Sequence, residues 1–136
     1  MSSRIVHFEI HAADPERAMK FYKNVFGWEF PRWMEDPPYW GVMTAAEGSE
    51  EPGINGGLMN RRGEAPSDGA PVNAFVCTIQ VDSYDFTHDK IIQAGGTVAV
   101  PKHAISGMAW QGYYKDTEGN IFGLHQRDEN ARENNI

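Results

Sequence analysis

One supersecondary pattern occurs twice in the sequence, and this repetition restricts the fold more than any other feature. An overlay of the two halves at an offset of 68 residues brings Asp14 onto Asp82. The same offset brings Gly27 onto Gly95. In each half the hydrophobic pattern predicts a strand, a helix and three further strands. Such a repeat indicates that neither half buries its sheet face alone.

The first half begins with an amphipathic strand and helix. Residues 4–11 alternate between apolar and polar side chains, which predicts a half-buried strand with the apolar side chains toward a helix. The helix begins after the N-cap Asp14 with Pro15 at its first position, and it ends at Gly27. Its apolar stripe comprises Ala18, Phe21, Tyr22 and Val25. Three strand-like runs follow, over residues 28–33, 39–45 and 54–60.

The second half repeats this order after a Gly- and Pro-rich linker over residues 61–71. The predicted elements are a strand over 73–81, a helix over 84–94 with Tyr84, His88 and Ile91 inside, and strands over 97–100, 108–115 and 120–126. We therefore predict one α+β domain over residues 1–136, built from a module over 4–60 and a module over 72–127. The two βαβββ modules are expected to form a curved sheet around a cleft.

The composition limits the partners of this domain. The chain has 12 Lys and Arg against 19 Asp and Glu, a net charge of −7, which argues against binding to nucleic acid. No apolar run approaches the roughly 20 residues that span a bilayer, and no signal peptide precedes the first strand. Cys77 is the only cysteine and is expected to be a small buried residue. These features predict a cytoplasmic protein without a membrane or nucleic-acid partner.

Three segments resemble one known group of proteins, the vicinal oxygen chelate superfamily. They are VHFEIHAADPERAMKFYKNVFGWEF near the N-terminus, GINGGL at residues 53–58 and KDTEGNIFG at residues 115–123. The superfamily includes glyoxalase I, bleomycin-resistance proteins, fosfomycin-resistance enzymes and extradiol dioxygenases. The resemblance covers about residues 4–127. It implies paired βαβββ modules, a small organic ligand and a homodimer.

The resemblance also implies where a divalent metal would bind. In metal-dependent members the ligands correspond to positions 7, 73 and 123, which here hold His7, Asn73 and Gly123. Glycine offers no donor, and an Asn amide is a weak ligand beside imidazole. Binding of a divalent metal is therefore possible but not favoured. His7 would be its ligand, with Glu9 as a possible second one.

His7 and Glu9 are the candidate catalytic residues, because they share the polar face of the first strand with His11. A carboxylate between two imidazoles could act as a general acid or base with a shifted pKa. The alternatives are a nonstandard metal site and a solvated strand face with a His–Glu hydrogen bond.

The candidate ligand-binding residues are Asn55, Asn73, Tyr113, His125 and Trp40. The two asparagines are expected to face inward as a polar pair that orients a ligand. Tyr113 could donate to an oxyanion or pack in the core with its hydroxyl at the rim. His125 shares a strand face with Gly123 and points either into the cleft or to the surface. The aromatic residues expected to wall the cleft or a dimer edge are Trp28, Trp33, Tyr39, Trp40 and Trp110.

These features predict a small-molecule-binding protein similar to glyoxalases. The first hypothesis is a lyase or isomerase with a degenerate metal site, and the alternative is a metal-independent protein that sequesters its ligand, as bleomycin-resistance proteins do. A purely structural protein would leave the His7 and Glu9 face without a purpose.

Overall fold

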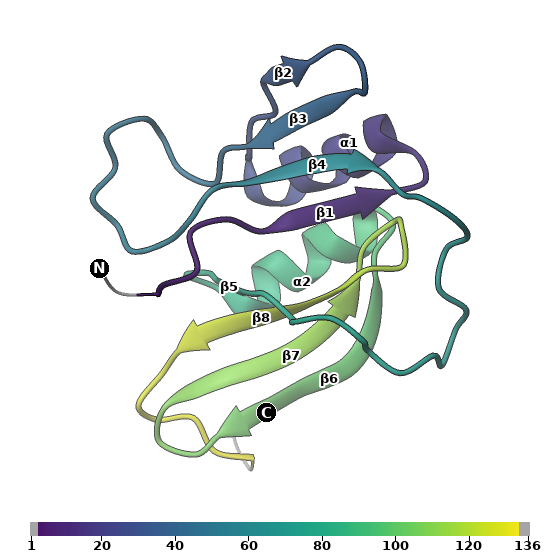
Figure 1. Cartoon of the computed structure of the whole chain (residues 1–136). Helices are drawn as coiled ribbons and strands as arrows, with labels where there is room; N and C mark the ends of the chain where they lie inside the picture. The colour runs from purple at the N-terminus through teal and green to yellow at the C-terminus, as the bar shows by residue number, and fades with distance from the viewer. Residues whose placement is uncertain (1–2, 134–136) are drawn as a thin grey trace. The chain divides into compact units, whose positions relative to one another are not determined.

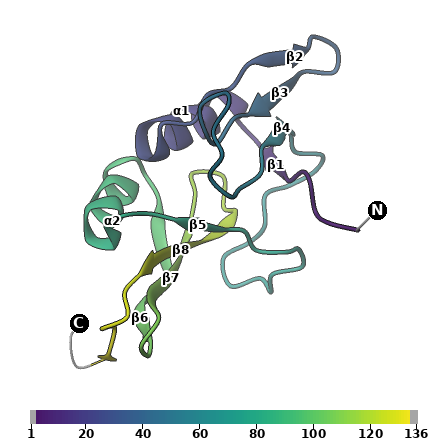
Figure 2. The same cartoon turned by 90° about the vertical axis from the view of Figure 1, so that its left-hand side faces the viewer.

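A computed structural model describes residues 3–133 of the chain, which divide between Ala65 and Pro66 into two compact units. The boundary lies within the predicted linker. Each unit is one four-stranded sheet with one helix on one of its faces (Figures 1 and 2). We call the other face of each sheet its helix-free face. Among residues 3–133, no helix is long and apolar enough to cross a bilayer.

The first unit has the predicted order of elements. They are β1 (Glu9–Ala12), α1 (Pro15–Phe26), β2 (Arg32–Met34), β3 (Tyr39–Val42) and β4 (Gly56–Asn60). The strand order is β1-β4-β3-β2, with β1 parallel to β4 and the other pairs antiparallel.

The second unit repeats this topology. Its elements are β5 (Thr78–Gln80), α2 (Tyr84–Gln93), β6 (Thr97–Ile105), β7 (Ala109–Lys115) and β8 (Ile121–Arg127). The strand order is β5-β8-β7-β6, and β5 runs parallel to β8. The predicted α+β fold with two βαβββ modules is therefore confirmed.

Local sequence signals fix both ends of α1. The Asp14 carboxylate accepts a hydrogen bond from the Arg17 amide at 3.1 Å, as an N-cap does. Gly27 ends the helix with φ +75°, a conformation that costs glycine little, and its amide donates to the Lys23 carbonyl. The buried residues of α1 are Ala18, Phe21, Tyr22 and Val25, the predicted stripe.

Aromatic stacking holds α1 against its sheet. The Trp28 ring stacks on Tyr22 at 5.1 Å between centroids and on Phe26 at 5.2 Å, and it contacts Phe8 at 6.3 Å. Trp28 is 9% exposed. Its prediction as a cleft or dimer-edge residue is wrong, because the rings of α1 and of Phe8, which directly precedes β1, already enclose it.

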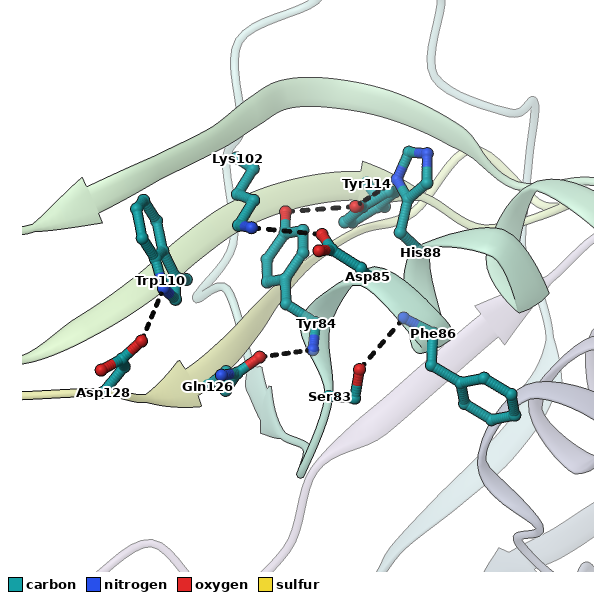
Figure 3. Close-up of polar contacts among 10 residues, drawn as sticks. All are labelled: Ser83, Tyr84, Asp85, Phe86, His88, Lys102, Trp110, Tyr114, Gln126 and Asp128. Carbon is teal, nitrogen blue, oxygen red and sulfur yellow. Dashed lines mark hydrogen bonds and ion pairs between the residues drawn. The ribbon is translucent and has the colours of Figure 1, made fainter. Parts of the chain in front are cut away.

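Hydrogen-bonded tyrosines hold α2 against its sheet (Figure 3). Tyr114 of β7 donates to the Tyr84 hydroxyl at 3.1 Å and therefore accepts from Nδ1 of His88 at 2.8 Å. Both phenol side chains are 1% exposed, and burial raises the pKa of each. Thr87 takes the buried position predicted for His88, which is half-buried.

Lysine and tryptophan complete this side of the second unit (Figure 3). The Lys102 ammonium lies 4.5 Å from the Trp110 ring centroid and bonds to Asp85 at 3.2 Å. The Trp110 indole donates to the Asp128 carboxylate at 3.0 Å. Trp110 is 5% exposed, so it belongs to the core and not to a cleft wall.

Backbone pairing makes both first strands shorter than predicted. Strand β1 begins at Glu9, since its partner β4 begins at Gly56, and Val6 is 78% exposed. Strand β5 covers only residues 78–80, so Asn73 lies in the preceding coil. Strand β6, by contrast, extends beyond the predicted Val100 to Ile105 through two irregularities of register.

The two modules do not superpose at one offset along their length. The Gly57 amide donates to the Phe8 carbonyl, and the Gly123 amide donates to the Cys77 carbonyl in the same topological position. Gly57 is thus the equivalent of Gly123, and Phe8 is the equivalent of Cys77. The single offset fails because loops and helices of the two modules differ in length. Cys77 is exposed, contrary to prediction.

Candidate functional site

The helix-free face of the first sheet contains a row of residues with little side-chain bulk. Glu9 pairs with Gly57, and Gly57 pairs with Gly41 on the next strand. Paired residues share a face of the sheet, so Glu9, Gly57 and Gly41 form a row across three strands in which only Glu9 has a side chain. This row leaves the backbone of β3 and β4 accessible to aromatic rings.

Two aromatic side chains cover these glycines. A Cβ atom at Gly57 would collide with the Tyr39 hydroxyl, and a Cβ atom at Gly41 would collide with the Trp33 indole. The Trp33 and Tyr39 rings are nearly parallel, 17° apart, with centroids separated by 6.3 Å. Trp33 is 51% exposed, so one half of its surface remains available to a ligand. The prediction placed these two aromatic residues at a binding surface, and the sheet register brings them together.

Tyr39 reaches across Gly57 and joins a hydrogen-bonded set that we call the carboxylate cluster: His7, Glu9, His11 and Tyr39. The Tyr39 hydroxyl donates to Oε2 of Glu9 at 2.9 Å. Nε2 of His11 lies 2.7 Å from Oε1 of Glu9, and Nε2 of His7 lies 3.0 Å from the Tyr39 oxygen. Because Tyr39 has one proton and gives it to Glu9, Nε2 of His7 is the donor to the phenol.

The cluster keeps Glu9 ionised. The hydrogen bond from His11 is the largest cause that lowers the Glu9 pKa, and the Tyr39 hydrogen bond and the two histidines add to it, against a smaller effect of burial. Burial, followed by the bond to Glu9, raises the pKa of Tyr39 to about 12. At neutral pH the site therefore presents a carboxylate and a protonated phenol.

The helix-free face of the second sheet has the same layout with different side chains. Thr78 pairs with Gly123, and Gly123 pairs with Tyr113. Gln111 lies across Gly123 as Tyr39 lies across Gly57: a Cβ atom at Gly123 would be 2.9 Å from the Gln111 amide nitrogen. Oε1 of Gln111 is 2.6 Å from Nδ1 of His125. The register thus brings the predicted residues Tyr113 and His125 to one face.

The other predicted ligand-binding residues do not join these sets. Oδ1 of Asn55 accepts hydrogen bonds from the amide and hydroxyl of Thr44, at 2.9 and 3.2 Å, and closes the loop between β3 and β4. Asn73 is exposed in the coil before β5. Trp40 pairs with the buried Leu58 and so lies on the helix side of its sheet, where the Arg32 guanidinium covers its ring at 4.7 Å.

Gln111 is the site residue that the sequence did not reveal. The available signal was Gly123, since a glycine inside a strand indicates close approach by another group. That signal does not say which side chain approaches, because the pairing register between β7 and β8 decides it.

The donor set does not fit the metal that the superfamily resemblance implies. Gly123 has no side chain, and a side chain there would displace Gln111 and Thr78. Within residues 3–133, no three His, Cys, Asp or Glu side chains converge in a way that could hold a metal ion. His7 and Glu9 instead bind the same phenol oxygen of Tyr39 from two sides. We derive no chemistry through a metal.

Comparisons with known proteins agree with this fold. A family model described as bleomycin resistance protein-like N-terminal matches residues 4–45. No curated protein matches the chain. Among solved structures, the fosfomycin resistance protein FosX from Listeria monocytogenes, complexed with Mn(II) and sulfate, is 19% identical with a TM-score of 0.69, over 93% of this chain and 91% of that one.

Two further structures share the fold. TnmS3, an antibiotic-binding protein from a Streptomyces species, is 21% identical with a TM-score of 0.64, over 94% of this chain and 99% of that one. A glyoxalase-related enzyme from Fulvimarina pelagi is 15% identical with a TM-score of 0.63, over 92% and 88%. The chain thus matches a bleomycin-resistance-like family model over residues 4–45 and shares its fold with these solved structures over nearly its whole length.

Proposed function

We propose that this protein binds and sequesters a flat organic cation on the helix-free face of its first sheet, without a metal. The observation that supports this proposal is that the half-exposed Trp33 ring stacks on Tyr39, whose hydroxyl donates to the ionised Glu9. A cation over an indole face gains roughly 0.5–2 kcal/mol. The net charge of −7 also attracts a positively charged ligand at long range.

Binding fits the cluster better than proton transfer does. A general base works best when its pKa lies near the working pH, whereas the hydrogen bonds of Glu9 lower its pKa. With a pKa of about 12, Tyr39 is a poor acid. The cluster therefore acts as a fixed negative charge with oriented donors. The antibiotic-binding protein TnmS3 gives a precedent for binding in this fold.

Calorimetric titration with N-methylacridinium and with neutral acridine at pH 8 tests the proposal. The two probes have the same ring system and differ in charge. We expect the cation to bind at least about threefold more tightly, and W33A to weaken it by about 3- to 30-fold. W40F, on the helix side of the sheet, is the matched control and should leave binding unchanged. Equal affinity of both probes, or full affinity in W33A, would contradict the proposal.

A metal-free lyase or isomerase is the second candidate, because His7, Tyr39, Glu9 and His11 form one continuous chain of hydrogen bonds. The variant Y39F separates the candidates. It keeps the ring and the carboxylate, so acridinium binding should remain within about threefold. Loss of a measurable turnover in Y39F with retained binding would favour the enzyme instead.

We also propose that the protein is a homodimer, which the superfamily resemblance supports. We propose a cytoplasmic location, which the exposed, free Cys77 thiol supports. Sedimentation at micromolar concentration should give twice the chain mass of 15.3 kDa. A mass of one chain would contradict the dimer without affecting the ligand proposal.

A further inference from the structure

In both modules one side chain crosses a strand glycine and hydrogen-bonds to a residue beyond it. We call this arrangement a bridge, and in the second module the bridging side chain also contacts a histidine. Gln111 and Tyr39 occupy equivalent positions, since each precedes by two residues the partner of the strand glycine. Tyr39 donates to Glu9, and the Gln111 amide donates to the equivalent Thr78 hydroxyl at 3.5 Å. Gln111 makes an additional contact, to His125, for which the first module has no counterpart because Met59 occupies that place.

The contact with Gln111 determines which imidazole nitrogen of His125 carries a proton. Oε1 of Gln111 is an acceptor only, so Nδ1 of His125, 2.6 Å away, must be the donor. A neutral His125 then has its lone pair on Nε2. Gln111 is 5% exposed, and its amide lies between the Thr78 hydroxyl and the His125 ring.

We propose that Gln111 is a positioning residue that holds His125 in the Nδ1–H tautomer, so that Nε2 accepts a hydrogen bond from a small molecule with a hydroxyl or N–H group. The half-buried Tyr113 lies on the same face, because its partner Gly123 and His125 are two residues apart on β8 and so point to one side. An aromatic ring with one donor group therefore matches this face. The site lies wholly within the second unit and does not depend on the cation proposed for the first.

Nitrogen-15 NMR of the imidazoles at a pH at which histidines are neutral tests the tautomer. We expect His125 to show a protonated Nδ1 and a non-protonated Nε2, and Q111L to shift it toward the Nε2–H form. His88, whose Nδ1 donates to Tyr114, is an internal control that should not change. If Q111L does not fold, Q111E should keep the Nδ1–H form, since a carboxylate is also an acceptor. An Nε2–H tautomer in the native protein would overturn the proposal.

Titration with phenol and with anisole tests the ligand chemistry, because the two probes differ in the donor group. We expect phenol to move the Nε2 resonance of His125 at least twice as far as anisole does at equal millimolar concentration. The difference should disappear in Q111L and persist in W33A, which lies in the other unit. Equal shifts from both probes would overturn the proposal that the ligand carries a hydrogen-bond donor. This holds whatever the outcome for acridinium on the first sheet.

Discussion

The two helix-free faces have the same backbone layout and different side chains at equivalent positions. In the first, Tyr39 crosses Gly57 and bonds to a carboxylate; in the second, Gln111 crosses Gly123 and bonds to a hydroxyl and an imidazole. Where the first face has the Glu9 carboxylate, the equivalent position of the second face has the Thr78 hydroxyl. The chemistry of each face therefore depends on a pair of residues, one on the first strand (Glu9 or Thr78) and one on the third (Tyr39 or Gln111).

The helix sides differ in a second way. Stacked rings around Trp28 hold α1, whereas α2 is held by buried hydroxyls that bond to one another. Dispersion and apolar burial tolerate small shifts of a ring, but a buried hydroxyl without its partner costs free energy. The second module should therefore be more sensitive to removal of a single polar atom.

The largest effect should come from the aromatic side of the first module. We expect W28A to lower the free energy of unfolding by about 3–5 kcal/mol, because it leaves a cavity among Tyr22, Phe26 and Phe8. Urea unfolding measures this change. Y114F, which removes one hydroxyl from the second module, should cost about 1–2 kcal/mol. A cost of Y114F below about 0.5 kcal/mol would contradict the sensitivity expected of the second module.

The glycines beneath the two bridges should give the next effects. We expect G57A and G123A each to lower the free energy of unfolding by about 1–3 kcal/mol, since an added methyl group displaces Tyr39 or Gln111. G57A should also raise the Glu9 pKa toward its ordinary value, as followed by carboxyl NMR, because the Tyr39 bond is lost. G123A, in the other module, is the matched control for that pKa and should leave it unchanged.

The smallest effect should come from the charge of Glu9. Its lowered pKa means that ionised Glu9 stabilises the fold above its unfolded pKa of about 4.3, and that this contribution disappears as the pH falls through the lower folded value. The Glu9 side chain is 39% exposed, so solvent screening limits the contribution to less than about 1 kcal/mol.

Urea unfolding of the native protein and of E9Q over pH 3–7 checks the sign. The stability difference should be constant above about pH 5 and should shrink toward acid. A difference that grows toward acid would mean that folding raises the Glu9 pKa, and it would contradict a first face built around an ionised carboxylate.

Local signals in the sequence were sufficient for the topology and for α1. The N-cap Asp14, the terminal Gly27 and the apolar stripe depend on neighbours in sequence, and all three predictions are confirmed. Face assignment was harder. Tyr39 and Trp40 are adjacent and so point to opposite sides, but only the pairing of Trp40 with the buried Leu58 shows which of them faces the helix.

The contacts across strands could not be predicted, since they depend on register. The overlay at one offset made Asn55 the counterpart of Gly123, whereas the hydrogen bonds make Gly57 the counterpart. That error of two residues hid the equivalence of Tyr39 and Gln111. The roles proposed for His7, Glu9, Tyr113 and His125 stay predictions that the experiments above address.

The strand glycines have a consequence for how this scaffold can change its specificity. A strand glycine leaves space above the backbone, and a side chain from the next strand occupies that space. The side chain that occupies it is then the group that lies on that face of the sheet. Under the proposed function, positions 39 and 111 would decide ligand preference, while other positions provide the helix packing. Exchange of those two residues would alter the preferred ligand and leave both hydrophobic cores as they are.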